Sequence, residues 1–425
     1  MDSGKKNASS NFGMQGWFII FLGMLMWFAS ASITVEGANL IIPLYGELHN
    51  VGTAVLYMMA TVASLICIPL VALVGYLQTR IGPRKVVSLC WLTAGIGMFI
   101  FGISGGIVDY SIGRIVVGVG TTCANYIGLN GIIANWFPRK KDLALGYITI
   151  GSNISTAVAL IIINFLIARF GLSGMFWVWG IFYIVIAVLA YWRLRDNPED
   201  MNCYPDNDRS MTMEDVQRLH QEGEEYKKNS PWTVKAILKT KQCWQIAIGY
   251  GVILLITVGI LSTLVTSLMI KGMEQNSAIY MMTVAAICAI PCSYLWGYLG
   301  TKFSTKKATI LLYGIIFLTI ITMLIPSGKI VYVTVALVGC FIGAGNNLTP
   351  AIISTVYGRY DFQKALAVIM PIWNCVVAFG SSAVGVPQSL TGSYTAAYIV
   401  LLIIAVIGFC MVLSLSDKCI GREDL

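Results

Sequence analysis

Long apolar runs alternate with short polar segments along the whole chain. Because a helix needs about 20 apolar residues to cross the roughly 30 Å hydrocarbon core of a bilayer, runs of this length indicate membrane-spanning helices. Twelve such runs occur, six on either side of a longer polar segment. They cover residues 17–45, 52–77, 84–106, 109–135, 143–168, 172–194, 243–270, 276–300, 305–326, 329–356, 365–388 and 394–415. The pattern predicts an all-α integral membrane protein with twelve transmembrane helices in two six-helix bundles.

The same pattern divides the chain into five regions. We expect an N-terminal tail at 1–16, a bundle at 17–194, a linker at 195–241, a second bundle at 242–415 and a C-terminal tail at 416–425. The first run exceeds the roughly 7–15 apolar residues of a signal-peptide core and lacks a small-residue cleavage site, so we expect it to remain in the mature protein. In the linker, Thr212 precedes acidic residues and an apolar stripe, which predicts a short capped helix on the cytoplasmic face.

Composition and the placement of charge support a membrane protein. Hydrophobic residues make up 57% of the chain and charged residues 11%, against about 25% charge in a typical soluble domain. The net charge is +8, but the basic residues gather in polar segments that share one side with the N-terminus. Of the 28 Lys and Arg, all lie there except Arg114, Arg169, Lys271 and Lys329. This bias predicts a multi-pass protein of the cell membrane with both termini in the cytoplasm, and it explains the charge without a nucleic-acid partner.

Two short motifs recur in the second half of the chain. Residues 75–80 read GYLQTR, and residues 297–302 read GYLGTK. Residues 132–139 and 352–359 form a second pair at nearly the same offset, each running from Ile-Ile to an Arg. Matches that include loop residues and lie in register favour a duplication. A duplicated membrane chain predicts two pseudo-symmetric bundles around a central cavity that work by alternating access.

At these residues the chain resembles the major facilitator superfamily over essentially its whole length. The superfamily's signature loop between helices 2 and 3, a cytoplasmic gate, is matched by Gly75, Arg80, Gly82, Arg84 and Lys85. Its helix 4 signature is matched by Arg114, Gly118 and Gly120. Within the superfamily, residues 135–146 are similar to a stretch shared by monocarboxylate porters and the oxalate/formate antiporter group.

The chain departs from this resemblance in two places. The signature loop usually has an acid immediately before its first Arg, but Thr79 occupies that position, so a charge clasp at the gate would lack one partner. Carboxylate-carrying relatives tend to place basic residues in helices 8 and 11. Here residues 276–300 carry no charge, and helix 11 has only Lys364 at its edge. These departures weigh against a dicarboxylate substrate.

Two charged residues lie within predicted spans, Glu36 in the first and Arg114 in the fourth. Since a charge near the bilayer centre costs at least about 2.5 kcal/mol, each requires a reason. The superfamily's architecture implies that both helices line the cavity. Glu36 is therefore a candidate proton carrier, held ionised by Arg114 until motion separates the two. A static ion pair is one alternative, and an Arg114 bound by backbone carbonyls, with Glu36 facing the outer vestibule, is another.

Polar and aromatic residues on the spans supply candidate contacts for a solute. Those that we expect to line the cavity are Asn39, Asn125, Tyr126, Asn346, Asn347, Trp373 and Asn374. Asn346 and Asn347, with Pro350, are expected to interrupt the tenth span, which would free backbone groups for a solute. Helix packing is the alternative role for each of these residues.

The residues favour transport over catalysis. Most of the 11 Cys fall in apolar runs and the 2 His fall in polar segments, so we expect no metal and no cofactor. An enzyme needs converging acid, base or nucleophile groups, which the spans do not supply. We predict a monomeric secondary transporter of a small-molecule substrate, an organic acid or aromatic metabolite, coupled to protons and surrounded by membrane lipid. Export of cationic or neutral amphipathic compounds and uncoupled exchange of organic anions are the alternatives.

Overall fold

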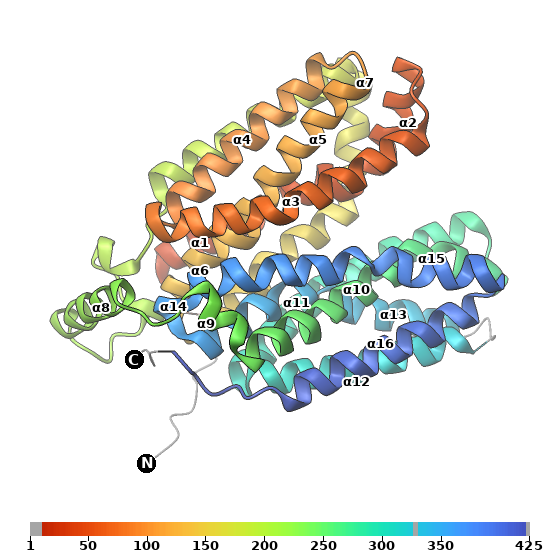
Figure 1. Cartoon of the computed structure of the whole chain (residues 1–425). Coiled ribbons are helices and arrows are strands. Elements are labelled where there is room, and N and C mark those ends of the chain that lie inside the picture. The colour runs from red at the N-terminus through yellow and green to blue at the C-terminus, as the bar shows by residue number, and fades with distance from the viewer. Residues whose placement is uncertain (1–10, 326–329, 422–425) are drawn as a thin grey trace.

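The structure, a computed structural model, describes residues 11–325 and 330–421, and every regular element in them is a helix. Figure 1 shows two bundles that converge at the side where the chain ends lie and diverge toward α2 and α15. We call these sides the linker end and the open end. Asn11, at one chain end, accepts a hydrogen bond from Lys140, and Ile420, at the other, donates one to Val356. Both ends of the described chain therefore lie at the linker end.

The first bundle contains six crossings, of which the first and fourth are each made of three helical pieces. Its elements are α1 (Gly13–Ala31), the π-helix η1 (Ser32–Glu36), α2 (Ala38–His49), α3 (Thr53–Ile81), α4 (Pro83–Ile103), α5 (Ile107–Thr122), the π-helix η2 (Cys123–Leu129), α6 (Asn130–Trp136) and α7 (Lys141–Arg193). Helix α7 supplies two crossings, because Gly171 has a φ of 72° that interrupts the helix between them.

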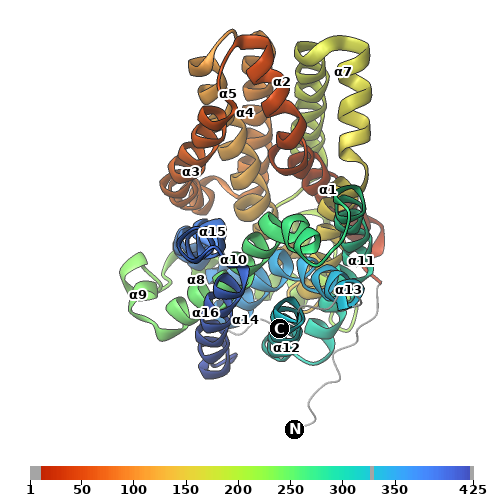
Figure 2. The same ribbon diagram turned by 90° about the vertical axis from the view of Figure 1, so that its right-hand side faces the viewer.

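The second bundle repeats this arrangement. Its elements are α10 (Lys241–Ile270), α11 (Gln275–Lys302), α12 (Thr305–Leu324), α13 (Val331–Ile342), α14 (Gly345–Ala378), α15 (Gly380–Thr391) and α16 (Tyr394–Ser414). Gly358, with a φ of 75°, divides α14 between two crossings. Viewed from the open end, the first bundle lies above the second in Figure 2, and α7 of the first contacts α11 of the second.

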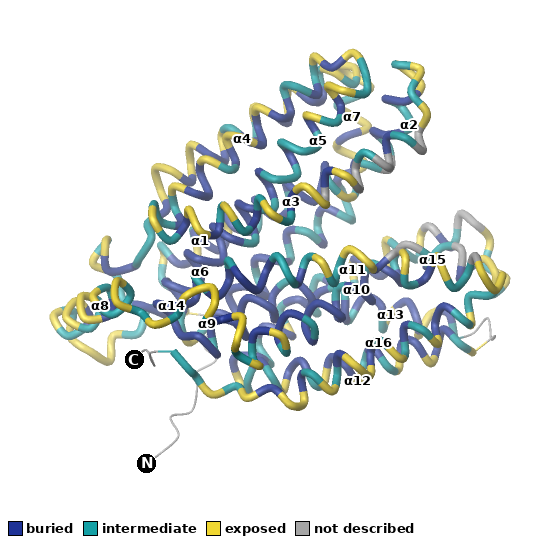
Figure 3. Tube along the Cα trace, in the orientation of Figure 1, coloured by how far each residue is buried: buried dark blue, intermediate teal, exposed yellow. Residues whose placement is uncertain are grey.

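Apolar helices of spanning length confirm the predicted fold. The described residues contain 9 candidate spans, and two of these, of 53 and 58 residues, are long enough for two crossings each. Helix α3, of which Leu65–Ile81 is apolar, supplies the remaining crossing. Large apolar side chains such as Ile161, Phe165 and Ile403 are exposed on the outward faces, which suits contact with lipid and not with water (Figure 3).

At the linker end the bundles meet through two equivalent close crossings. On one side α3 packs against α14, where a Cβ on Gly75 would lie 2.6 Å from the Ala367 Cβ. On the other side α7 packs against α11, where a Cβ on Gly146 would lie 3.1 Å from the Gly297 Cα. Gly75 and Gly297 are the first residues of the repeated motif. The repeated sequence motif therefore takes part in both of the close crossings at the linker end.

The linker covers this junction. It folds into η3 (Pro198–Met201), η4 (Pro205–Asn207), α8 (Met213–Lys228) and α9 (Val234–Lys239). The predicted capped helix is confirmed, since the Thr212 side chain accepts a hydrogen bond from the Asp215 backbone at the start of α8. Glu199 forms a bidentate ion pair with Arg359 of α14, with both N–O distances at 2.9 Å and both side chains 3% exposed.

We expect Arg359→Ala to destabilise the protein strongly, because it leaves the Glu199 carboxylate buried without its partner. Removing one member of a buried pair costs about 3–5 kcal/mol. The matched control is Arg139→Ala, which breaks an exposed pair with Asp208 at 3.1 Å and costs at most about 1 kcal/mol. Thermal unfolding of the purified protein in detergent checks this, and equal melting temperatures for the two variants would contradict it.

Candidate functional site

Two adjoining cavities lie between the bundles. The glutamate cavity has a volume of about 270 Å³, and it is lined by Trp27, Ser30, Ala31, Thr34, Val35, Glu36, Thr121, Thr122, Asn125, Tyr126, Ser152, Asn153, Thr156, Leu254, Thr257, Val258, Leu261, Ile342 and Asn346. The arginine cavity, of about 220 Å³, is lined by Thr34, Ala63, Cys67, Ile68, Val71, Arg114, Gly118, Thr122 and Asn374. Thr34 and Thr122 line both cavities, so the two adjoin to form one region.

Breaks in regular helix surround this region. In η1 the backbone N–H of Gly37 donates to the carbonyl of Ser32 at 2.8 Å, a bond one residue wider than in an α-helix. Helix η2 carries Asn125 and Tyr126. In the second bundle, a turn at 343–344 separates α13 from α14 just before Asn346. π-Helical segments like η1 and η2 are rare in proteins, and they are found frequently at functional sites.

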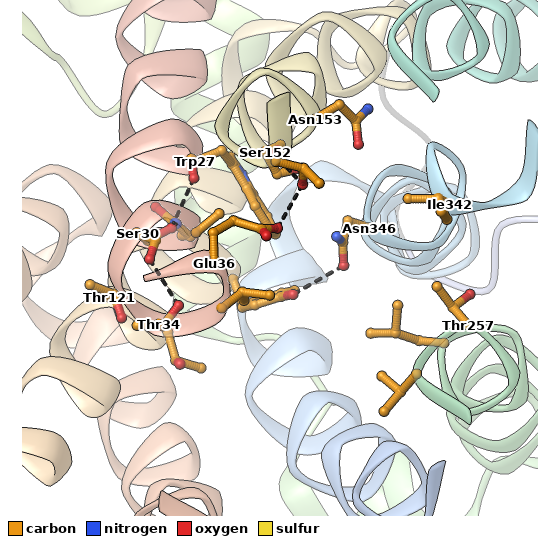
Figure 4. A pocket seen from close by; sticks show the side chains of 18 of the residues that line it. Trp27, Ser30, Thr34, Glu36, Thr121, Ser152, Asn153, Thr257, Ile342 and Asn346 are labelled. Carbon is orange, nitrogen blue, oxygen red and sulfur yellow. Dashed lines mark hydrogen bonds between the residues drawn. The ribbon is translucent and has the colours of Figure 1, made fainter. Parts of the chain in front are cut away.

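Of the described residues that line the glutamate cavity, only Glu36 is charged. Its Oε1 accepts a hydrogen bond of 2.7 Å from Thr156 Oγ1 of α7. Figure 4 shows Glu36 on one side of the cavity, with Asn346 and Thr257 of the second bundle on the facing side. The carboxylate thus meets any solute that enters between the bundles.

Arg114 lies in the adjoining cavity and makes no ion pair with Glu36. Its Nη2 donates to the backbone carbonyl of Thr34 at 3.1 Å. Among the described residues, the ion pairs within 4.0 Å involve Arg139, Arg218, His220, Lys227 and Arg359, and none involves Arg114. Because Thr34 belongs to η1, the guanidinium nevertheless contacts the π-helix that carries Glu36.

Of the other predicted cavity residues, three line the glutamate cavity. Asn125 donates to Ser30 Oγ at 2.8 Å, and its Oδ1 has no hydrogen-bond partner among the described residues. Tyr126 donates to Asn346 Oδ1 at 3.0 Å and so joins the two bundles. Its ring lies 5.0 Å from that of Trp27, centroid to centroid.

The remaining predicted cavity residues are placed differently. Asn374 lines the arginine cavity. Asn347 is fully buried and donates to the Ser293 carbonyl at 3.3 Å, so it packs α14 against α11. Trp373 is buried behind Tyr126, at 5.7 Å between ring centroids. The side chain of Asn39 lies outside the described part of the structure.

Several cavity residues were missed by the sequence analysis. Trp27, Ser30 and Thr34 recur at intervals of three and four in the first crossing, and Ser152 and Thr156 do so in the fifth. A sequence signal was therefore available, since polar and aromatic side chains at this spacing share one face of an apolar helix. Asn153 connects the bundles, since its Nδ2 donates to Ser293 Oγ at 2.8 Å and to the Ala289 carbonyl at 3.2 Å.

The signature loop lies at the linker end, away from both cavities. Gly82 has a φ of 87°, and a Cβ there would clash with the Asp196 carboxylate. Asp196 Oδ1 accepts the backbone N–H of Arg84 at 2.6 Å, so it caps the first turn of α4. Burial raises the pKa of Asp196, and the bond from Arg84 opposes this rise. Arg80 contacts Tyr76, and Lys85 is exposed. Thr79 of the signature loop has no carboxylate, and the linker supplies one instead through Asp196.

Comparison with known proteins identifies the family. Residues 16–328 match the Major Facilitator Superfamily. Monocarboxylate transporter 12 of Mus musculus is 23% identical over 313 residues, which are 67% of this chain and 60% of that protein. The match thus spans less than two thirds of the length of this curated relative.

Solved structures share the fold at low sequence identity. The proton:xylose symporter XylE superposes with a TM-score of 0.70 at 15% identity, over 95% of this chain and 97% of its own. The human organic anion transporter MFSD10 superposes with a TM-score of 0.69 at 11% identity, over 93% and 98%. Together with the family match over most of the chain, the duplicated helical fold and the polar cavity between its halves, these likenesses lead to one conclusion. The chain belongs to the major facilitator superfamily, and its apolar helices are those of a multi-pass membrane protein.

Proposed function

We propose that this transporter carries a small organic acid or aromatic metabolite across the cell membrane by alternating access, coupled to protons. One observation carries the proposal: an acid, Glu36, belongs to the π-helix η1, and a guanidinium, that of Arg114, contacts the same helix, in adjoining cavities between the two bundles. Charges in a membrane interior are retained for function. The names of the mouse monocarboxylate transporter and of the human organic anion transporter support an acidic solute.

Alternating access agrees with where the bundles touch. Among the described residues, the hydrogen bonds that join the two bundles lie at the wall of the glutamate cavity, as from Tyr126 to Asn346, or nearer the linker end, as from Leu143 to Thr301. The positive-inside bias of the sequence assigns the linker end, with both termini, to the cytoplasm. In this assignment the conformation faces outward, and the crossings at Gly75 and Gly297 form the closed cytoplasmic gate together with the signature loop.

Proton coupling would follow from a conformational change in η1. Here Glu36 is held by Thr156 and Arg114 by the Thr34 carbonyl, so acid and guanidinium are apart. Rewinding η1 as regular α-helix would rotate Glu36 relative to Thr34, and a move toward Arg114 would favour the ionised acid. No other charged side chain lines the glutamate cavity in the described residues. Glu36 would therefore load a proton in one conformation and release it in the other.

The two alternatives each have one supporting feature. An exporter of cationic or neutral amphipathic compounds would use Glu36 with the rings of Trp27 and Tyr126. An uncoupled exchanger of organic anions would use Arg114, which is free of Glu36 in this conformation. Transport assays in which organic acids or organic cations compete with the solute distinguish these two alternatives.

We expect Glu36→Gln to abolish accumulation driven by a pH gradient while sparing exchange, because the amide cannot carry a proton. Proteoliposomes are tested for uptake of radiolabelled lactate, pyruvate and benzoate, with and without the gradient. At least a tenfold loss of gradient-driven uptake is expected, with counterflow retained. Glu47→Gln, at an exposed acid of α2, is the matched control. A variant at Glu36 that still responds to the gradient like the wild type would refute the coupling.

We expect Gly297→Leu to open the linker end and close the open end, because a side chain there would collide with the Asp142 carbonyl, 2.5 Å from a Cβ. Gly314→Leu is the control, since no atom lies within 4 Å of a Cβ at that position. Spin labels at the exposed Leu48 and Leu390 report the separation of the bundles. They are introduced as non-natural amino acids, because the chain has 11 cysteines. A shorter distance is expected in Gly297→Leu alone, and an unchanged distance there would contradict the proposed gate.

A further inference from the structure

The arginine cavity brings together hydrogen-bond donors from both bundles. Of the described residues that line it, all belong to the first bundle except Asn374 of α14. Arg114 comes from α5, on the first bundle's side. The Asn374 Nδ2 atom is buried and has no hydrogen-bond partner among the described residues. The cavity therefore has an amide donor on one wall and a guanidinium on the other.

These donors are matched by an anion with two acceptor atoms. The guanidinium carries five N–H donors, and the structure gives Arg114 one hydrogen bond, to a neutral carbonyl. A planar carboxylate offers two oxygens in the geometry that a guanidinium binds best. A buried amide N–H₂ without an acceptor is costly, and the same carboxylate would accept from it.

We propose that Arg114 and Asn374 together bind the carboxylate of the transported solute, and that the solute's body, which carries no further negative charge, occupies the glutamate cavity. This deepens the proposed function, on which it rests, by naming the substrate class as monocarboxylates. The body reaches the glutamate cavity past Thr34 and Thr122, which line both spaces. There it meets the rings of Trp27 and Tyr126 and the apolar side chain of Ile342.

Glu36 sets the charge of the body. Among the described residues it is the only charged group lining the glutamate cavity, so a second carboxylate placed there would be repelled while Glu36 is ionised. An uncharged body can instead pack on the rings, and the buried Trp27 Nε1 and Asn125 Oδ1, which have no partner among the described residues, are free to bond with a polar group on it. The site therefore selects a monoanion over a dianion.

The carboxylate also bridges the bundles. Arg114 is fixed to the first bundle through Thr34, and Asn374 belongs to the second. An anion held by both draws the two walls of the arginine cavity together, which would narrow the open end. Substrate binding and occlusion are then one event. Asn374 is essential to it, because it is the donor on the second bundle.

Thermal shift of the purified transporter tests the site, with benzoate and phenylacetate as probes. Each is compared with its amide and with terephthalate as the dianion. The wild type is expected to bind the monocarboxylates at least about tenfold more tightly than the amides or the dianion, since hydrogen bonds to a charged group are the stronger class. Asn374→Leu, which removes the amide at similar size, is expected to lose at least about tenfold of this affinity, and Asn374→Gln to retain most of it.

The label pair at Leu48 and Leu390 adds a structural readout. Benzoate is expected to shorten this distance in the wild type and not in Asn374→Leu, while a pair within the first bundle, Leu48 and Ile103, stays constant. Binding of amides or dianions as tight as that of the acids, no binding of either acid, or full affinity in Asn374→Leu would each overturn the inference. Failure of the proton-coupling proposal would show separately, as uptake that ignores the pH gradient while benzoate still binds through Asn374.

Discussion

Every polar group placed inside a bilayer must find a partner, and this constraint shapes the centre of the molecule. Regular helices satisfy their own backbone and leave nothing for a solute. The chain departs from regular helix where the cavities lie: in η1, in η2 and at the turn between α13 and α14. In η1 the wider turn leaves the Thr34 carbonyl available to Arg114, and it directs Glu36 toward Thr156. The scaffold thus consists of regular helices, and the residues that line the cavities gather at its irregular turns.

The two charges inside the membrane act on one short segment. The Arg114 side chain donates to a backbone carbonyl of η1, and Glu36 belongs to the same segment. Whatever binds the guanidinium therefore alters the setting of the acid without touching it. In the proposed function, this arrangement would link solute and proton through a single turn of helix, without a long path of coupled residues.

The fold was largely predictable because spanning length and charge bias are properties of composition along the chain. The outlying charges, Glu36 and Arg114, were also visible, since their cost in lipid makes them exceptional. Their contacts were not, because Thr156 lies on another helix and nothing in the letters of Ser32–Glu36 distinguishes a π-turn from an α-turn. Asn347 and Trp373 show the same limit: polar or aromatic residues in a span serve packing as readily as a cavity, and only the packing decides.

The linker does more than connect two bundles. Through Asp196 it caps α4 of the first bundle, and through Glu199, three residues later, it holds Arg359 of the second. These two attachments make it a short strap across the junction at the linker end. Parting the junction must stretch or detach that strap, so the stability of the conformation seen here depends on a segment that belongs to neither bundle.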